Sequence, residues 1–180
     1  MNQILKTPQI PHSVEAPLTF AIRDGAAPVS LPSRPGEGVG RYEGDHETRT
    51  VQITNAWPLA DELSLDREGF QLVHHHTDVD FYDDGERTTT YEREIEALIK
   101  QTTGAKRVIV FDHTLRAGDD GTRAERAVRE PVQMVHNDYT GRSARQRLRD
   151  LVGDAEAKKL MNGRFAIMNV WRGNRQTVES

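Results

Sequence analysis

A His-x-Asp pair, His136 and Asp138, brings together two side chains that could bind a metal ion. Residues i and i+2 of an extended strand point to the same face, so the imidazole and the carboxylate would converge while Asn137 points away. One imidazole and one carboxylate are two of the three ligands of the facial triad that holds non-haem Fe(II). The short pattern also fits a structural His and Asp, so the surrounding sequence has to separate the two interpretations.

The histidines at 74–76 and His113 could also bind a metal ion, but their positions in the sequence favour other roles. The consecutive histidines 74–76 alternate between the two faces of a strand, and we interpret them as non-ligands. His113 follows Asp112 at the end of a short apolar segment, which favours a hydrogen-bonded structural pair over a metal ligand. The acidic segment 78–86 does not match a calcium-binding loop, because no Gly and terminal Glu lie in register, and a solvated turn is expected.

The composition narrows the class of protein. The chain has 180 residues, no Cys and a formal net charge of -4, which suggests one domain without disulfides, thiolate metal sites or a Cys nucleophile. The negative charge gives no reason to expect nucleic acid or an anionic membrane as partner. No apolar run is long enough to span a membrane, and the N-terminal residues lack the apolar region of a signal peptide. We therefore expect a cytoplasmic protein.

Apolar periodicity predicts the elements that would position these side chains. Strands are expected at 18–22, 48–55, 107–111, 132–139 and 165–171, and helices at 58–67, 89–103, 143–152 and 154–161. Thr89 and Glu92 fit a capping box at the start of the second helix, and Gly104 is expected to end it. Thr140 is the expected N-cap of the helix that follows the His-x-Asp strand. The arginines of that helix, Arg145, Arg147 and Arg149, are expected to form a solvated face.

The N-terminal region differs in composition from the rest. Residues 1–17 are expected to form an extended arm, and the Gly- and Pro-rich segment 24–44 a long loop. This loop could be a surface linker or a flap over a site, and we favour the linker. We divide the chain into an arm and loop at 1–45 and a domain at 46–180. The charged segment 118–130 is expected to be a mobile loop.

Six blocks of sequence, taken in this order and spacing, resemble one known family. They are Asp80-Phe81-Tyr82, Tyr91-Glu92, Thr103-Gly104-Ala105, Phe111-Asp112-His113-Thr114, Val135-His136-Asn137-Asp138-Tyr139-Thr140 and Asn169-Val170-Trp171-Arg172. The chain resembles the CmcJ/NvfI-type hydroxylase/desaturase family of Fe(II)/2-oxoglutarate-dependent oxygenases, some members of which carry a methyltransferase label. The resemblance covers residues 48–180.

The resemblance implies a mainly β fold with flanking helices (α+β), built on the double-stranded β-helix, or jelly roll. It implies Fe(II) as cofactor and 2-oxoglutarate as co-substrate, with His136 and Asp138 as iron ligands. Arg172 is a candidate for binding a carboxylate of 2-oxoglutarate. The candidate residues of the substrate pocket are Tyr139, Trp171 and His113. For Trp171 we favour packing in the core over contact with substrate.

The chain departs from the family in one respect that affects the metal site. The family's second histidine lies downstream of the His-x-Asp pair, and no His follows His136 here. The resemblance therefore implies the N-terminal part of such an enzyme, with a jelly roll incomplete at its C-terminal end. Unpaired strand edges would favour self-association. His113 or His74 could complete the triad instead. Both precede the His-x-Asp pair in the chain, whereas the family's second histidine comes from a later strand of the barrel.

Three functions remain open at this point. The first is an oxidoreductase that hydroxylates or desaturates a small molecule, such as a secondary metabolite. The second is an inactive fragment or an interaction protein derived from this family. The third is a methyltransferase, which is disfavoured because the Gly cluster at 36–44 precedes no strong helix of the kind that binds S-adenosylmethionine.

Overall fold

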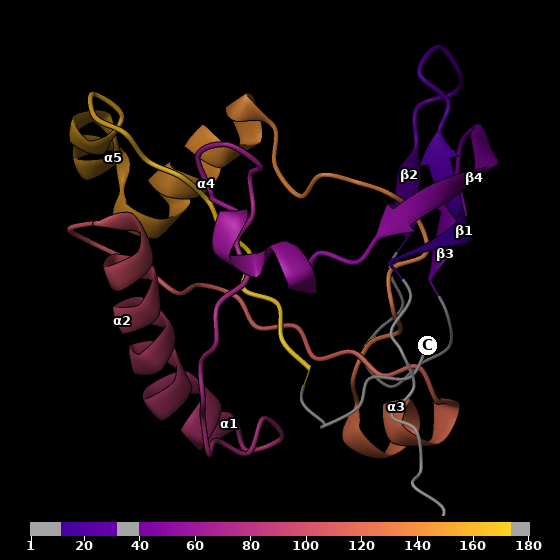
Figure 1. The fold of residues 1–180 in the computed structure, drawn as a ribbon. Coiled ribbons are helices and arrows are strands. Elements are labelled where there is room, and N and C mark those ends of the chain that lie inside the picture. The colour runs from indigo at the N-terminus through magenta and orange to yellow at the C-terminus, as the bar shows by residue number, and fades with distance from the viewer. Residues whose placement is uncertain (1–11, 32–39, 174–180) are drawn as a thin grey trace, which may run out of the picture. The chain divides into compact units, whose positions relative to one another are not determined.

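The computed structural model describes residues 12–31 and 40–173 (Figure 1). These residues divide into two compact units. Among the described residues, unit 1 contains 12–28, 44–76 and 133–135. Unit 2 contains 29–31, 40–43, 77–132 and 136–173. Each unit is described by itself below. The division of the chain at residue 45 stays a prediction.

Unit 1 is built on an antiparallel pair of strands, β1 (Ser13–Ala21) and β4 (His46–Thr54). The ladder runs from Ser13 opposite Thr54 to Ala21 opposite His46, so β1 includes the last residues of the expected N-terminal arm. The strands predicted at 18–22 and 48–55 are confirmed in this pair. The amide of Val135 donates to the carbonyl of Thr19 at 2.9 Å, which brings the segment 133–135 alongside β1.

The rest of unit 1 holds one short helix. The 3-10 helix η1 (Trp57–Glu62) has a proline in its first turn and confirms only the first half of the helix predicted at 58–67. Proline is accepted there because the first helical amides have no intrahelical partner. The indole of Trp57 lies against the imidazole of His74, with ring centroids 6.1 Å apart.

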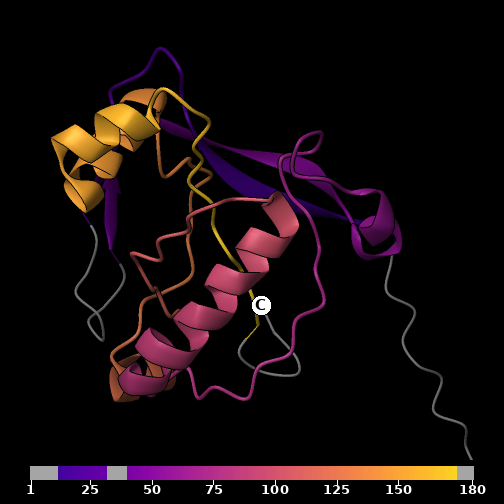
Figure 2. The same cartoon turned by 90° about the vertical axis from the view of Figure 1, so that its left-hand side faces the viewer.

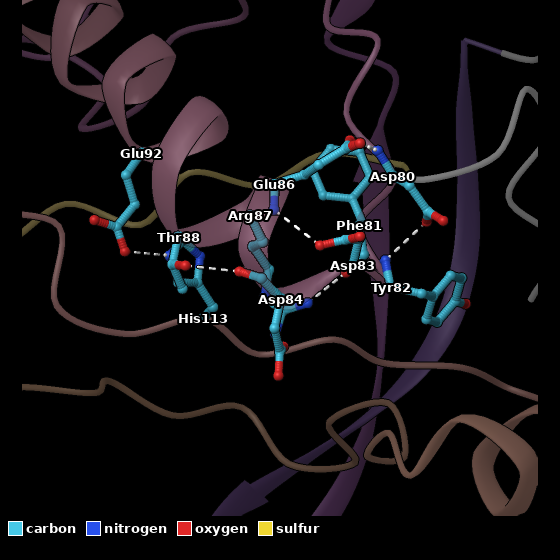
Figure 3. Close-up of polar contacts among 10 residues, drawn as sticks. All are labelled: Asp80, Phe81, Tyr82, Asp83, Asp84, Glu86, Arg87, Thr88, Glu92 and His113. Carbon is cyan, nitrogen blue, oxygen red and sulfur yellow. Dashed lines mark hydrogen bonds and ion pairs between the residues drawn. The ribbon is translucent and has the colours of Figure 1, made fainter.

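The main helix of unit 2 is one continuous run made of α1 (Asp84–Glu86), the π-helical turn η2 (Arg87–Tyr91) and α2 (Glu92–Thr103) (Figure 2). The helix begins at Asp83, whose carboxylate accepts the amide of Glu86 at 3.0 Å (Figure 3). The capping box predicted at Thr89 is therefore wrong, because the Asp83 carboxylate already starts the helix upstream. Thr89 lies inside the helix and donates its hydroxyl to the carbonyl of Gly85.

The end of this helix is as predicted. Gly104 has φ +71°, the left-handed conformation that glycine adopts without a steric penalty, and its amide donates to the Lys100 carbonyl at 2.9 Å. The buried face of the helix includes Tyr91 and Ile95, which with Val128 and Ala157 form the small apolar core of unit 2.

The segment predicted as a mobile loop at 118–130 contains a helix, α3 (Asp120–Arg126), so that prediction is wrong. The Asp119 carboxylate caps the helix by accepting the amide of Thr122 at 2.7 Å. The guanidinium of Arg123 is only 9% exposed and donates to the Gly118 carbonyl at 2.6 Å. These local bonds hold a short charged helix that has no apolar stripe to reveal it in the sequence.

Two further helices follow the His-x-Asp pair. Helix α4 (Gly141–Val152) starts at the predicted cap, Thr140, whose hydroxyl accepts the amide of Ser143 at 3.1 Å, while the Ser143 hydroxyl accepts the amide of Thr140. Helix α5 (Asp154–Leu160) follows directly after Gly153. No helix among the described residues is long and apolar enough to cross a membrane.

Regular strands are fewer than the resemblance implies. Apart from β1 and β4, the described residues form one ladder, between β2 (Val29–Leu31) and β3 (Arg41–Glu43), which lies in the expected long loop. The segments predicted as strands at 107–111, 132–139 and 165–171 are neither helical nor part of a ladder, although Met134 forms an isolated parallel bridge with Thr19. Helices hold more of the described residues than strands do. The mainly β prediction is corrected accordingly. An apolar extended segment becomes a strand only when a neighbour pairs its amides and carbonyls.

Candidate metal site

The side chains of His136 and Asp138 converge in unit 2, as their spacing predicts. The imidazole Nε2 lies 3.2 Å from the carboxylate Oδ1, and the two side chains are 47% and 44% exposed. Two adjacent ligands of an octahedral ion, each about 2.1 Å from it, are about 3.0 Å apart. The separation is that of a His–Asp ion pair, and it is also close to the separation of two neighbouring ligands of one metal ion.

The second carboxylate oxygen of Asp138 has a different partner. The side-chain amide of Asn169 donates from Nδ2 to Oδ2 at 2.6 Å. Asn169 comes from the segment 165–171, which carries one of the six blocks, and sequence reasoning assigned it no role. No signal within the chain links two residues 31 positions apart, so only the structure identifies this contact.

A third ligand is not brought to the pair within the described part of the chain. All seven histidines lie there, and no group of three or more His, Asp or Glu side chains in it could hold a metal ion. His113 Nε2 lies 3.0 Å from the Glu92 carboxylate Oε1, with only 18% of its side chain exposed (Figure 3). The structural interpretation of His113 is thus supported, but its partner is Glu92 and not the adjacent Asp112.

Arg172 lies against two aromatic rings. Its guanidinium carbon is 5.6 Å from the ring centroid of Phe81 and 5.8 Å from that of Tyr91, and the two rings meet edge to face at 4.9 Å. Burial raises the pKa of the Tyr91 hydroxyl, and the charge and hydrogen bond of Arg172 partly oppose this. The contacts fix the guanidinium next to a buried phenol. The role of Arg172 toward 2-oxoglutarate stays a prediction.

Tyr139 is fixed by the helix that follows it. Its hydroxyl accepts Arg147 Nε at 3.2 Å, and its ring lies 6.4 Å from that of Phe111. The hydrogen bond to Tyr139 and the nearby phenol raise the pKa of Arg147, whose guanidinium carbon also lies 5.4 Å from the Phe111 ring. Arg147 is therefore engaged with two aromatic side chains, beyond the solvated role expected for it.

Trp171 lies on the surface of unit 2. Its side chain is 79% exposed, and Met168 and Val170 in the same segment are also exposed. The expected core position of Trp171 is wrong. The physical reason is that the segment 165–171 forms no ladder with another described strand, so none of the described strands packs beside it.

The chain matches known proteins over most of its length. Residues 18–180 match the family model described as YDMC, an oxidoreductase/YMDC permease-like domain. Oxidoreductase AN1597 of Emericella nidulans is 35% identical over 135 residues, covering 71% of this chain and 45% of the relative. Hydroxylase/desaturase CTB9 of Cercospora beticola is 33% identical over 155 residues, covering 79% and 48%. The chain therefore spans about half the length of the relatives that it matches.

A solved structure shares the fold. The iron and alpha-ketoglutarate-dependent endoperoxidase NvfI superposes with a TM-score of 0.62 at 20% identity, over 84% of this chain and 56% of NvfI. At this identity the likeness concerns the fold alone.

Proposed function

This chain belongs to the family of Fe(II)/2-oxoglutarate-dependent hydroxylases and desaturases, and on that premise we propose that it acts as an oxidoreductase on a small molecule of secondary metabolism. The observation that carries the proposal is the separation of 3.2 Å between His136 Nε2 and Asp138 Oδ1. A neutral imidazole nitrogen and a carboxylate oxygen are the donor types of the non-haem iron triad. In this proposal His136 and Asp138 are two of the iron ligands.

The donor set fits two of the three ligand positions. His136 and Asp138 are at a suitable separation, and Asp138 keeps one oxygen, Oδ1, on the side of the imidazole. When bound, Fe(II) together with 2-oxoglutarate and O2 supplies the oxidising power that attacks an unactivated C–H bond. The protein's own contribution is to hold the two donors and to orient a substrate beside them.

Arg172 is the proposed partner of a 2-oxoglutarate carboxylate. The rings of Phe81 and Tyr91 lie within cation–π distance of its guanidinium. A ring interacts with the flat face of a guanidinium, whereas a carboxylate binds the N–H groups at its edge. The two kinds of contact are compatible in one side chain. Tyr139, Trp171 and His113 remain proposed pocket residues, of which Trp171 presents the most open surface.

We also propose that the extended segments 107–111, 132–139 and 165–171, which form no ladder among the described residues, become strands of a jelly roll once other strands pair with them. The support is the fold shared with NvfI and the apolar composition of the segments. Such strands have backbone groups that another strand can pair, which favours self-association of the chain. Size-exclusion chromatography over a range of concentrations tests this, since association predicts a larger apparent size at higher concentration.

A second candidate function is an inactive, family-derived chain. It is favoured because the described residues supply only two ligands at this site. A site that lacks one imidazole binds iron more weakly. The two candidates differ in one measurable property, the ability of the folded chain to form a complex with Fe(II) and 2-oxoglutarate.

Titration of the purified chain with Fe(II) and 2-oxoglutarate under anaerobic conditions separates these candidates. The proposal predicts the metal-to-ligand charge-transfer absorbance of the complex, and predicts that H136A and D138A lose it. The variant N137A is a matched control, since this exposed side chain lies between the two ligands in sequence and should leave the absorbance unchanged. A folded wild-type chain without the absorbance would reject the enzyme proposal and support the inactive chain.

A further inference from the structure

We infer that Asn169 is a positioning residue of the metal site, which acts by orienting the carboxylate of Asp138. The inference rests on the proposed function, because it takes Asp138 as an iron ligand. Asn169 Nδ2 donates to Asp138 Oδ2 at 2.6 Å, while Asp138 Oδ1 lies 3.2 Å from His136 Nε2. Each carboxylate oxygen thus has its own partner, and the two partners come from different segments.

This division of the two oxygens determines how the carboxylate can bind. A free aspartate side chain can rotate and can present one oxygen or both to a metal ion. Donation from the Asn169 amide occupies Oδ2 and leaves Oδ1 facing the imidazole of His136. The predicted result is a carboxylate that binds through a single oxygen, next to the histidine.

The amide is suited to this task because it carries no charge. A Lys or Arg at this place would also donate to Oδ2, but its positive charge would repel the metal ion. An Asn side chain supplies the donor without that repulsion. Hydrogen-bond partners of this kind, which hold the metal ligands and not the metal, commonly contribute about 10- to 100-fold to metal affinity.

Asn169 and Asp138 are both exposed, so their hydrogen bond is expected to orient the carboxylate more than to stabilise the fold. Asn169 is exposed, and the Asp138 side chain is 44% exposed. A hydrogen bond between exposed groups adds little to the stability of the fold, because water replaces either partner on unfolding. Replacement of Asn169 should therefore leave stability unchanged and weaken metal binding.

The first test needs no metal and examines the hydrogen bond itself. In an isotope-labelled chain, nuclear magnetic resonance reports the side-chain amide protons of Asn169. We expect the donated amide proton to be shifted downfield in the wild type and in H136A, and to lose this shift in D138A. An Asn169 amide signal that is the same in the wild type and in D138A would overturn the inference.

The second test is a calorimetric titration with Fe(II) alone, without oxygen. Asn169→Leu keeps the branched shape of the side chain and removes the donor, and Asn169→Ala removes both. We expect each to weaken Fe(II) binding by about 10- to 100-fold, with the urea unfolding midpoint unchanged and with N137A binding like the wild type. Two variants of different size keep the test valid if one of them fails to fold.

The outcomes distinguish this inference from the proposed function. Wild-type affinity for Fe(II) in a folded N169L chain would overturn the role of Asn169 and leave the proposed function standing. Equal weakening in N169L and N137A would also overturn it, since the effect would not depend on the Asp138 contact. No Fe(II) binding by the folded wild-type chain would reject the metal site and the positioning role together.

Discussion

The imidazole Nε2 of His113 lies 3.0 Å from the carboxylate Oε1 of Glu92, which connects the first residue of α2 to the end of the segment 107–113 (Figure 3). The imidazole also lies beside the ring of Tyr91, with centroids 6.3 Å apart. Both side chains of the pair are largely shielded from solvent, at 18% and 34% exposure. The contact gives His113 a structural role in unit 2 and directs it away from metal binding.

Replacement of His113 by Ala should therefore destabilise the protein without changing its affinity for Fe(II). The partly buried Glu92 carboxylate would lose its partner, at a cost of about 1–3 kcal/mol in the free energy of unfolding. Urea unfolding measures the first effect, and anaerobic titration with Fe(II) measures the second. A clear loss of Fe(II) affinity in H113A would identify His113 as a ligand after all. Glu92→Gln, which keeps a hydrogen-bonding side chain, should cost less than His113→Ala.

Replacement of Thr140 by Ala should destabilise the start of α4. The change removes the hydroxyl that accepts the Ser143 amide, and loss of such a cap costs about 1 kcal/mol in the free energy of unfolding. Thr140 lies two residues after Asp138, so weaker metal binding is also expected. Thermal unfolding followed by circular dichroism measures the stability. Thr114→Ala, at an exposed position outside any helix, is the matched control, and equal shifts in both variants would contradict the capping role.

The protein should lose stability at alkaline pH through Tyr91. Burial raises the pKa of its hydroxyl above the ordinary value of 10.0, so the neutral form is favoured in the folded state. The resulting stability is fully present below the pKa of the unfolded chain and is lost as pH rises through the higher pKa of the folded chain. Between neutral and alkaline pH, the wild type should lose more unfolding free energy than Y91F, which has no hydroxyl to ionise. Parallel curves would contradict this prediction.

Replacement of Arg172 by Lys should weaken unit 2 although the charge is kept. The flat guanidinium contacts Phe81 and Tyr91 together, and a lysine ammonium cannot cover two rings in the same way. We expect a loss of about 1 kcal/mol in the free energy of unfolding, measured by urea denaturation. Arg126→Lys is the matched control, because Arg126 contacts the single ring of Tyr82. A control that loses more stability than R172K would contradict the two-ring interpretation.

The sequence predicted helix ends better than strands when the capping residue lies next to the helix it ends or begins. Gly104 ends α2 and Thr140 begins α4 because each acts on amides and carbonyls within four residues of itself. The start of the main helix differs from the prediction because two residues near it could each cap a helix. Asp83 and Thr89 are both suitable caps, and the sequence does not rank them, whereas in the structure the Asp83 carboxylate binds the amide of Glu86.

The strands were predicted less well because pairing is not local. The segments at 48–55 and 18–22 became strands because β1 and β4 pair with each other. The segments at 107–111 and 165–171 are as apolar, yet they form no ladder within the described residues. Apolar composition indicates that a segment can be extended, and only a neighbouring backbone makes it a strand.

At the candidate metal site the sequence by itself determined that His136 and Asp138 converge, since a spacing of two places both on one face of an extended segment. It also determined the family, through blocks whose order and spacing do not depend on any contact. Only the tertiary structure decided which partners the site residues have. Asn169 reaches Asp138 and Glu92 reaches His113 across 31 and 21 positions of sequence. Contacts over such distances depend on how whole segments pack, which no local pattern of residues specifies.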